Sequence, residues 1–159
     1  MKKQQNKSYS IDEIRSKMEY FCSYQDRCYQ EVEEKLKNFN LIPAAKEQVM
    51  IFLIENNYIN EERFAKSFAR GKHNYKSWGK VRISLELKFR GISKKNIELA
   101  LAEISTENYF NHFHQLAEKH WESCKERKGP KKNKKFVDFL LRKGYESHLV
   151  YDKLQELNQ

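Results

Sequence analysis

The sequence predicts an all-α protein of three tandem three-helix repeats, which together form an elongated, curved helical array. The 159 residues include only five glycines and two prolines, although proteins of strands and turns need many of both. Apolar residues recur at matching positions in three successive segments of the chain. Residues that suit helix ends stand at the borders of these segments.

The internal repeat is centred on Asn40, Gly91 and Gly144, which are 51 and 53 residues apart. The positions eight and four residues before each centre, and one, ten and thirteen after it, are all apolar. They are Val32, Leu36, Leu41, Met50 and Leu53, then Ile83, Leu87, Ile92, Leu101 and Ile104, then Phe136, Leu140, Tyr145, Leu154 and Leu157. Spacings of four and three residues place side chains on one helix face. Because Asn and Gly tolerate the left-handed backbone that ends a helix, each centre predicts a helix, a stop and a second helix.

The first repeat is expected over residues 9–59, after a basic tail at residues 1–8 that we expect to be disordered. Its first helix should run from Ile11 to Ser23, because Ser10 and Glu13 form a capping-box sequence in front of it. Two further helices should lie on either side of Asn40, and Pro43 suits the first position of the second one.

The second repeat, residues 60–104, should begin with a helix from Glu61 to Lys72, for which Asn60 is a suitable N-cap. Its middle segment, residues 81–89, is ambiguous, because apolar and polar residues alternate there as they do in a half-buried strand. The repeat favours a helix in this segment, and Ser93 can cap the helix that follows.

As a helix, residues 81–89 carry two apolar rows on opposite sides. The rows are Val81, Leu85 and Phe89 on one side and Ile83 and Leu87 on the other. We expect both rows to be buried, since repeats on either side of the central one can pack on its middle helix.

The third repeat, residues 105–159, should begin with a helix from Glu107 to Glu126. Residues 125–135 follow with seven basic residues and one acidic residue around Gly129 and Pro130. Because like charges repel, this segment is expected to be a flexible, solvated linker before the eighth helix. The alternative is a secondary contact with a DNA backbone through Lys131, Lys132, Lys134 and Lys135.

Positive charge is concentrated in the central repeat. The formal net charge is +9, and residues 60–104 carry eleven basic against five acidic residues. Such a concentration predicts an acidic or polyanionic partner.

The sequence also predicts a cytoplasmic protein. The longest apolar run, Val49 to Ile54, is too short to cross a membrane, and the N-terminal residues lack the apolar stretch of a signal peptide. The cysteines are odd in number and contain no CxxC pair, which suits a reducing compartment.

The central repeat carries a motif that resembles the core signature of the RecX regulatory proteins. Its residues are Asn60-Glu61-Glu62-Arg63-Phe64-Ala65, then Phe68 and Arg70, then Gly79-x-x-Arg82-Ile83-x-x-x-Leu87-x-x-Arg90-Gly91-Ile92. The resemblance extends to Glu31-Val32-x-x-Lys35-Leu36 in the first repeat and more weakly to the third. Asn60-Glu61 stands where the family usually has an acidic pair, and Asn40 where Gly is common.

The resemblance implies a small, all-helical bacterial protein that binds the RecA recombinase and its filament on single-stranded DNA. Such proteins lie in the helical groove of the filament and usually inhibit its ATPase, strand-exchange and coprotease activities. No cofactor is implied, and we expect a monomer. The residues alone leave a second hypothesis open, a general single-stranded nucleic-acid-binding helical repeat.

The candidate partner-binding residues are the cations of the central repeat and one aromatic residue. They are Arg63, Arg70, Lys72, Lys76, Trp78, Lys80, Arg82, Lys88, Arg90, Lys94 and Lys95. The cations would face acidic filament walls or DNA phosphates, or they form a solvated surface on which Arg82 and Arg90 pair with Glu86. Around Trp78, aromatic and basic residues alternate as they do in single-strand binders, although Trp78 could instead staple the next helix.

No catalytic or metal site is expected. His120 and Cys124 are four residues apart and could form one ligand pair, but no second pair is evident beside them. The chain contains no Gly-rich phosphate loop, nucleophile elbow or HExxH motif, so we expect a protein that is not an enzyme.

Overall fold

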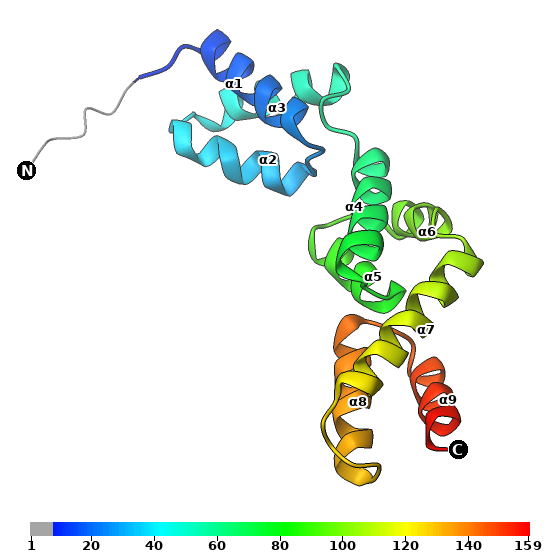
Figure 1. Ribbon diagram of the computed structural model, residues 1–159. Coiled ribbons are helices and arrows are strands. Elements are labelled where there is room, and N and C mark those ends of the chain that lie inside the picture. The colour runs from blue at the N-terminus through cyan, green and yellow to red at the C-terminus, as the bar shows by residue number, and fades with distance from the viewer. Residues whose placement is uncertain (1–7) are drawn as a thin grey trace, which may run out of the picture. The chain divides into compact units, whose positions relative to one another are not determined.

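The computed structural model describes residues 8–159, so nearly all of the predicted basic tail at residues 1–8 lies outside it. The described residues form nine α-helices and one short 3-10 helix, without a strand, which confirms the all-α prediction (Figure 1). The chain divides into two compact units, residues 1–64 and 65–159. The borders of the three repeats stay a prediction.

The first unit contains α1 (Ile11–Tyr24), α2 (Tyr29–Leu36), the 3-10 helix η1 (Lys37–Phe39) and α3 (Pro43–Glu55). The expected N-cap is present, because the Ser10 hydroxyl accepts a hydrogen bond from the Glu13 amide at 3.2 Å. Asn40 ends η1 in the left-handed conformation, with φ at 50°. The core of the described part of this unit is Ile14, Met18, Cys22, Val32, Leu36, Val49, Met50, Leu53 and Ile59.

The second unit contains most of α4 (Glu61–Lys76), then α5 (Lys80–Phe89), α6 (Lys94–Ala102), α7 (Thr106–Ser123), α8 (Pro130–Lys143) and α9 (Ser147–Asn158). The helix stops follow the prediction, because Gly91 and Gly144 have φ angles of 76° and 97°. All fifteen repeated apolar positions are buried or half-buried. Leu36, Leu87 and Leu140 are at most 1% exposed, so the burial predicted for these three leucines is confirmed.

Residues 81–89 are helical, but the expectation that both apolar rows of this helix are buried is wrong. Ile83 and Leu87 are fully buried, whereas Val81, Leu85 and Phe89 are 43%, 61% and 84% exposed. The packing neighbours of α5 cover only the side of Ile83 and Leu87. We call the exposed residues Val81, Leu85 and Phe89 the outer row of α5.

The linker predicted at residues 125–135 is shorter in the structure, because residues 130–135 belong to a helix. Helix α8 begins at Pro130, which occupies its first turn, so that only residues 124–129 connect it to α7. Glu126 offsets the expected repulsion, because its carboxylate lies 3.4 Å from the Lys131 amine and 2.8 Å from that of Lys135. Lys134 pairs with Asp138 one turn later, at 2.6 Å.

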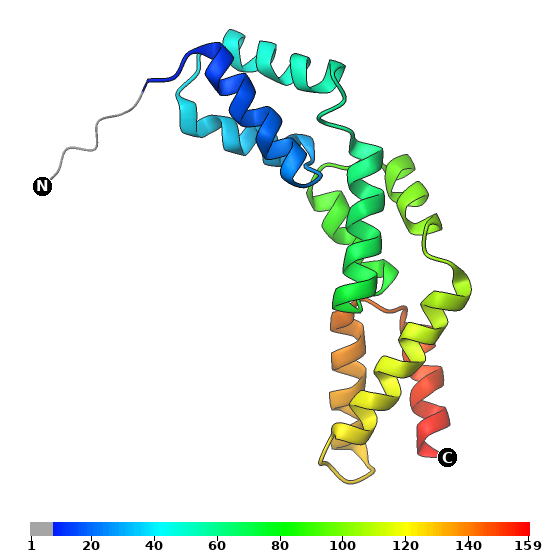
Figure 2. The same cartoon turned by 45° about the horizontal axis from the view of Figure 1, so that its top comes forward.

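A backbone seam joins the start of α5 to the end of α8 (Figure 2). The amides of Gly79 and Val81 donate hydrogen bonds to the carbonyls of Lys143 and Gly144, at 2.8 and 3.0 Å. The first amides of a helix and the last carbonyls of another both lack partners within their own helix, so the seam satisfies both at once. A Cβ atom on Gly79 would lie 2.3 Å from the Gly144 carbonyl oxygen, so the backbones meet at a distance that only glycine permits.

A buried polar network supports the seam. The Tyr109 hydroxyl accepts a hydrogen bond from the Lys80 amide at 3.0 Å and donates one to Glu146 at 2.6 Å. Burial, together with the bond to Glu146, raises the pKa of Tyr109, so that the hydroxyl keeps its proton. The buried His73 ring places Nδ1 3.0 Å from the Trp78 carbonyl, and burial lowers the pKa of this histidine. The segment that carries Trp78 is therefore held from both ends.

We predict that Leu87→Ala lowers the free energy of unfolding by about 2–5 kcal/mol, because Leu87 is fully buried and the change leaves a cavity. Leu85→Ala, two residues away on the same helix, is the matched control. Leu85 is 61% exposed, so its replacement should change stability by less than about 0.5 kcal/mol. Urea unfolding measures both values, and equal losses in the two variants would contradict the assignment of the two faces of α5.

The seam generates a second prediction. Gly79→Ala should cost about 1–3 kcal/mol, because the new methyl group overlaps the Gly144 carbonyl and must push α5 and α8 apart. Gly71→Ala is the control, since no atom lies within 4 Å of its Cβ position in α4. It should raise stability by roughly 0.5–1 kcal/mol. Thermal unfolding of both variants tests the seam, which is refuted if Gly79→Ala is neutral.

Candidate partner-binding surface

Cations and aromatic rings stack on one another between α4 and α5. The guanidinium carbon of Arg82 lies 4.0 Å from the centroid of the Trp78 ring, and the Lys72 amine lies 4.9 Å from it. Phe68 meets Trp78 edge to face at 6.1 Å and carries the Arg90 guanidinium 4.8 Å from its own centroid. These five residues form what we call the cation–aromatic stack. It includes four members of the predicted binding set and fixes their side chains in place.

Glu86 does not pair with both of its arginine neighbours. Arg90 bonds its carboxylate at 2.9 Å, as the spacing predicts. Arg82 instead donates to the Arg142 carbonyl of α8 at 3.2 Å, in addition to covering Trp78. The alternative in which Glu86 pairs with both arginines thus holds for Arg90 alone, because α8 offers Arg82 a carbonyl that the local spacing could not reveal.

Among the other predicted cations of α4 to α6, some contact a ring or a carboxylate and others do not. Lys80 lies 4.8 Å from the centroid of the Tyr109 ring, and Arg70 lies 3.7 Å from Glu103 while half of its side chain stays exposed. Four lysines extend into solvent from the C-terminal turns of α4 and α5 and the first turn of α6. They are Lys76, Lys88, Lys94 and Lys95.

Lys143 of α8 joins this basic surface, although the sequence did not mark it as a candidate. Its amine donates to the Lys76 carbonyl at 3.0 Å, which brings it next to the end of α4. Burial, together with the nearby charges of Arg82 and Lys76, lowers the pKa of Lys143. Crowded cations repel one another, so an acidic group placed here would relieve unfavourable electrostatic energy.

The outer row of α5 lies between these cations. At 100° per residue, Lys88 flanks the row on one side, and Arg82 flanks it on the other. The helix therefore presents an exposed apolar strip with positive charge on both sides. Exposed apolar strips with charged borders are typical of surfaces that bind another protein.

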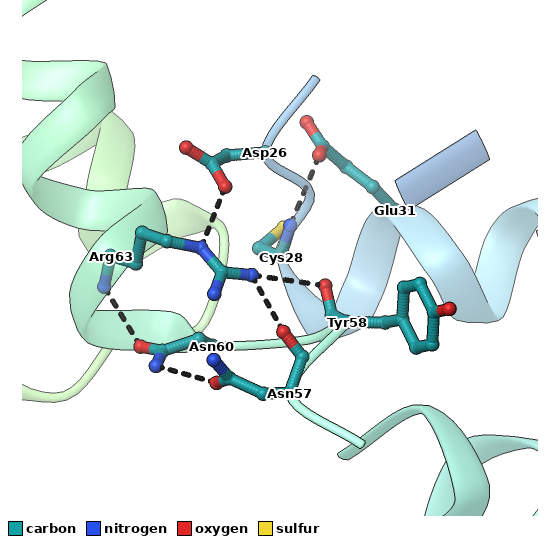
Figure 3. Close-up of polar contacts among 7 residues, drawn as sticks. All are labelled: Asp26, Cys28, Glu31, Asn57, Tyr58, Asn60 and Arg63. Atoms are coloured by element: carbon teal, nitrogen blue, oxygen red, sulfur yellow. Dashed lines mark hydrogen bonds and ion pairs between the residues drawn. The ribbon is translucent and has the colours of Figure 1, made fainter. Parts of the chain in front are cut away.

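Arg63 forms an ion pair and hydrogen bonds within the first unit (Figure 3). Its guanidinium pairs with Asp26 at 2.8 Å and donates to the carbonyls of Asn57 and Tyr58 at 2.9 and 3.3 Å. Its backbone amide donates to the Asn60 side chain at 2.9 Å, so the expected N-cap of α4 is present. These bonds tie the turn before α4 to the loop after α1.

The four lysines of the predicted secondary basic contact interact with side chains of residues 121–138. Lys131 and Lys135 pair with Glu126, and Lys134 pairs with Asp138. Lys132 lies 4.3 Å from the centroid of the Trp121 ring.

His120, one of the two residues considered as a metal-ligand pair, stacks on Phe139 at 3.9 Å between ring centroids. Residues 8–159 contain no group of three potential metal-binding side chains.

Within the described residues, no helix is both long and apolar enough to cross a membrane.

Two family models match the chain. One is that of the second three-helix domain of RecX, at residues 60–101, and the other is that of the third three-helix domain, at residues 107–154. The matched segments begin beside the N-caps of α4 and α7.

Curated relatives agree with the family models. The chain is 30% identical over 139 residues to the regulatory protein RecX of Bacillus cytotoxicus, covering 87% of this chain and 52% of that protein. It thus spans about half the length of the Bacillus relatives that it matches. With the RecX of Vibrio campbellii it shares 33% identity over 77% of either chain. A crystal structure of RecX from Lactobacillus salivarius matches with a TM-score of 0.77 and 26% identity, over 93% of this chain and 96% of that one.

Proposed function

Because the chain belongs to the RecX family of regulatory proteins, we propose that it binds a RecA recombinase filament on single-stranded DNA and modulates its activity. The expected effect is inhibition of the ATPase, strand-exchange and coprotease activities of the filament. We further propose that the protein acts as a cytoplasmic monomer by binding alone, without catalysis and without a cofactor.

The observation that carries this proposal is the outer row of α5 between its flanking cations. Three apolar side chains in one row, the last of them 84% exposed, have no role in the core of the protein. Their burial against a partner would supply about 25 cal/mol for each Å² removed from water. The adjacent cations favour a partner surface with acidic groups.

The two features act on different steps of binding. Exposed cations such as Lys76 and Lys88 speed the encounter with an acidic partner, and this acceleration weakens with salt. The outer row slows dissociation, because its burial is lost when the complex separates.

Regulation then follows from a difference in affinity. A protein that binds one state of a filament better than another shifts the balance toward that state by no more than this difference. Repeated three-helix domains offer several contact surfaces on one chain, so that after the first contact the others form at a high effective concentration. Inhibition requires that the favoured state hydrolyse ATP slowly or lose subunits.

We predict that Lys76→Glu combined with Lys88→Glu weakens inhibition of the recombinase ATPase on single-stranded DNA. Both lysines are exposed, so the fold should persist while the association rate falls by about tenfold. The control is Lys119→Glu with Lys128→Glu, which changes the net charge equally at exposed positions of α7 and of the turn that follows it. ATPase rates with wild type and both variants decide the matter. Equal loss in the two variants would show that only the net charge matters, and no effect of the wild-type protein would refute the proposal.

A further inference from the structure

A groove of about 730 Å³ lies in the first unit and is lined by residues of α1, of α2 and η1, and of the segments that flank α1. Its lining contains five aromatic residues, three cations and two small polar residues. They are Tyr9, Tyr20, Phe21, Tyr24 and Phe39, then Lys17, Arg27 and Lys35, then Ser16 and Asn38. The cations and aromatic rings of the central repeat take no part in it.

The aromatic rings form a series along the groove. Tyr20 and Tyr24 are one turn apart on α1, with ring centroids 6.4 Å from each other, and they are 71% and 72% exposed. Tyr9 and Phe39 meet edge to face at 5.6 Å. The core of this unit does not use the two exposed tyrosines, so packing does not account for them.

The cations of the groove lie over the rings. The Arg27 guanidinium is 3.9 Å from the centroid of Phe21, and the Lys17 amine is 4.8 Å from that of Tyr9. Lys35 approaches Phe21 from α2 at 5.5 Å. Positive charge is thus held beside aromatic faces rather than spread over the surface.

Charge is segregated within this unit. The part of this unit that the structure describes, residues 8–64, contains seven basic and eleven acidic residues, so acids outnumber bases there. Nevertheless, three of the seven cations of residues 8–64 line the groove, and none of the eleven carboxylates of these residues does. If the lining residues simply reflected the composition of residues 8–64, the groove would carry more acidic than basic side chains. The lining therefore favours an anionic ligand that also offers flat rings.

We propose that this groove binds a single-stranded polynucleotide. Its bases would stack on Tyr20 and Tyr24, while Lys17, Arg27 and Lys35 would face its phosphates. The 6.4 Å between the tyrosine rings is close to twice the base-stacking distance of about 3.4 Å, so a base fits between them once the exposed rings turn parallel. The inference does not rest on the proposed regulation of a recombinase, because the groove would bind the strand on its own.

An acidic peptide is the competing occupant of such a groove. It would satisfy the three cations, but carboxylates would gain little from the exposed faces of Tyr20 and Tyr24. A polynucleotide uses rings and charge together, as single-strand-binding surfaces do. The two occupants therefore differ in how strongly they depend on the tyrosine rings.

The test measures the fluorescence anisotropy of a labelled oligothymidylate of about 16 nucleotides, titrated with the full chain without a recombinase. Tyr20→Ala with Tyr24→Ala should raise the Kd at least about tenfold, because the two rings on which the bases stack are removed. Tyr20→Phe with Tyr24→Phe should bind like the wild type, because the rings remain. Tyr151→Ala, an exposed tyrosine of α9, is the control and should have no effect.

Charge and ligand identity are tested in the same assay. Lys17→Gln with Lys35→Gln should reduce the slope of log Kd against log salt by about 1.4, the value for two phosphate contacts on a single strand. An oligouridylate of equal length should bind with a similar Kd, because stacked bases and phosphates are common to RNA and DNA. The proposal is overturned if the wild type does not bind, if the double alanine variant binds like the wild type, or if polyglutamate competes as well as the oligonucleotide.

Discussion

The seam between Gly79 and Gly144 is the constraint on which the arrangement of the second unit depends. Two helix ends with unpaired backbone groups meet there and satisfy one another, which is feasible only because neither glycine carries a Cβ atom. The buried network around Tyr109 closes the same junction with side-chain hydrogen bonds. Because Arg82 follows directly after the seam and donates to the end of α8, the junction also places the first member of the cation–aromatic stack.

Helix α5 shows how one element can serve both the core and a partner. Ile83 and Leu87 are fully buried and stabilise the unit, while the outer row remains in contact with water. The cations beside the outer row are held by rings and carbonyls on the side of Trp78, and on the side of Lys88 they are free to move in solvent. The ordered side of this border, next to Trp78, loses little conformational entropy on binding, which favours affinity.

The sequence predicted the features that depend on local spacing. Helix caps at Ser10, Asn60 and Ser93 and the stops at Asn40, Gly91 and Gly144 follow from the chemistry of single residues. Features that depend on which segments meet in space were not predictable in this way. Gly79 and Gly144 are 65 residues apart, and the number of neighbours around α5 decides which apolar row is buried. The groove of the first unit was not predicted either, because Arg27 and Phe39 reach the face of α1 that carries Lys17, Tyr20 and Tyr24 from later segments.

The most direct test of the account concerns the outer row of α5. The dissociation rate from a recombinase filament on single-stranded DNA should be measured for the wild type and for Leu85→Ser with Phe89→Ser. Both residues are exposed, so we expect an unchanged helical spectrum and a dissociation rate at least about tenfold faster. The salt dependence of association should stay the same, because no charge changes. A variant that dissociates as slowly as the wild type would contradict the claim that this row anchors the protein to its partner.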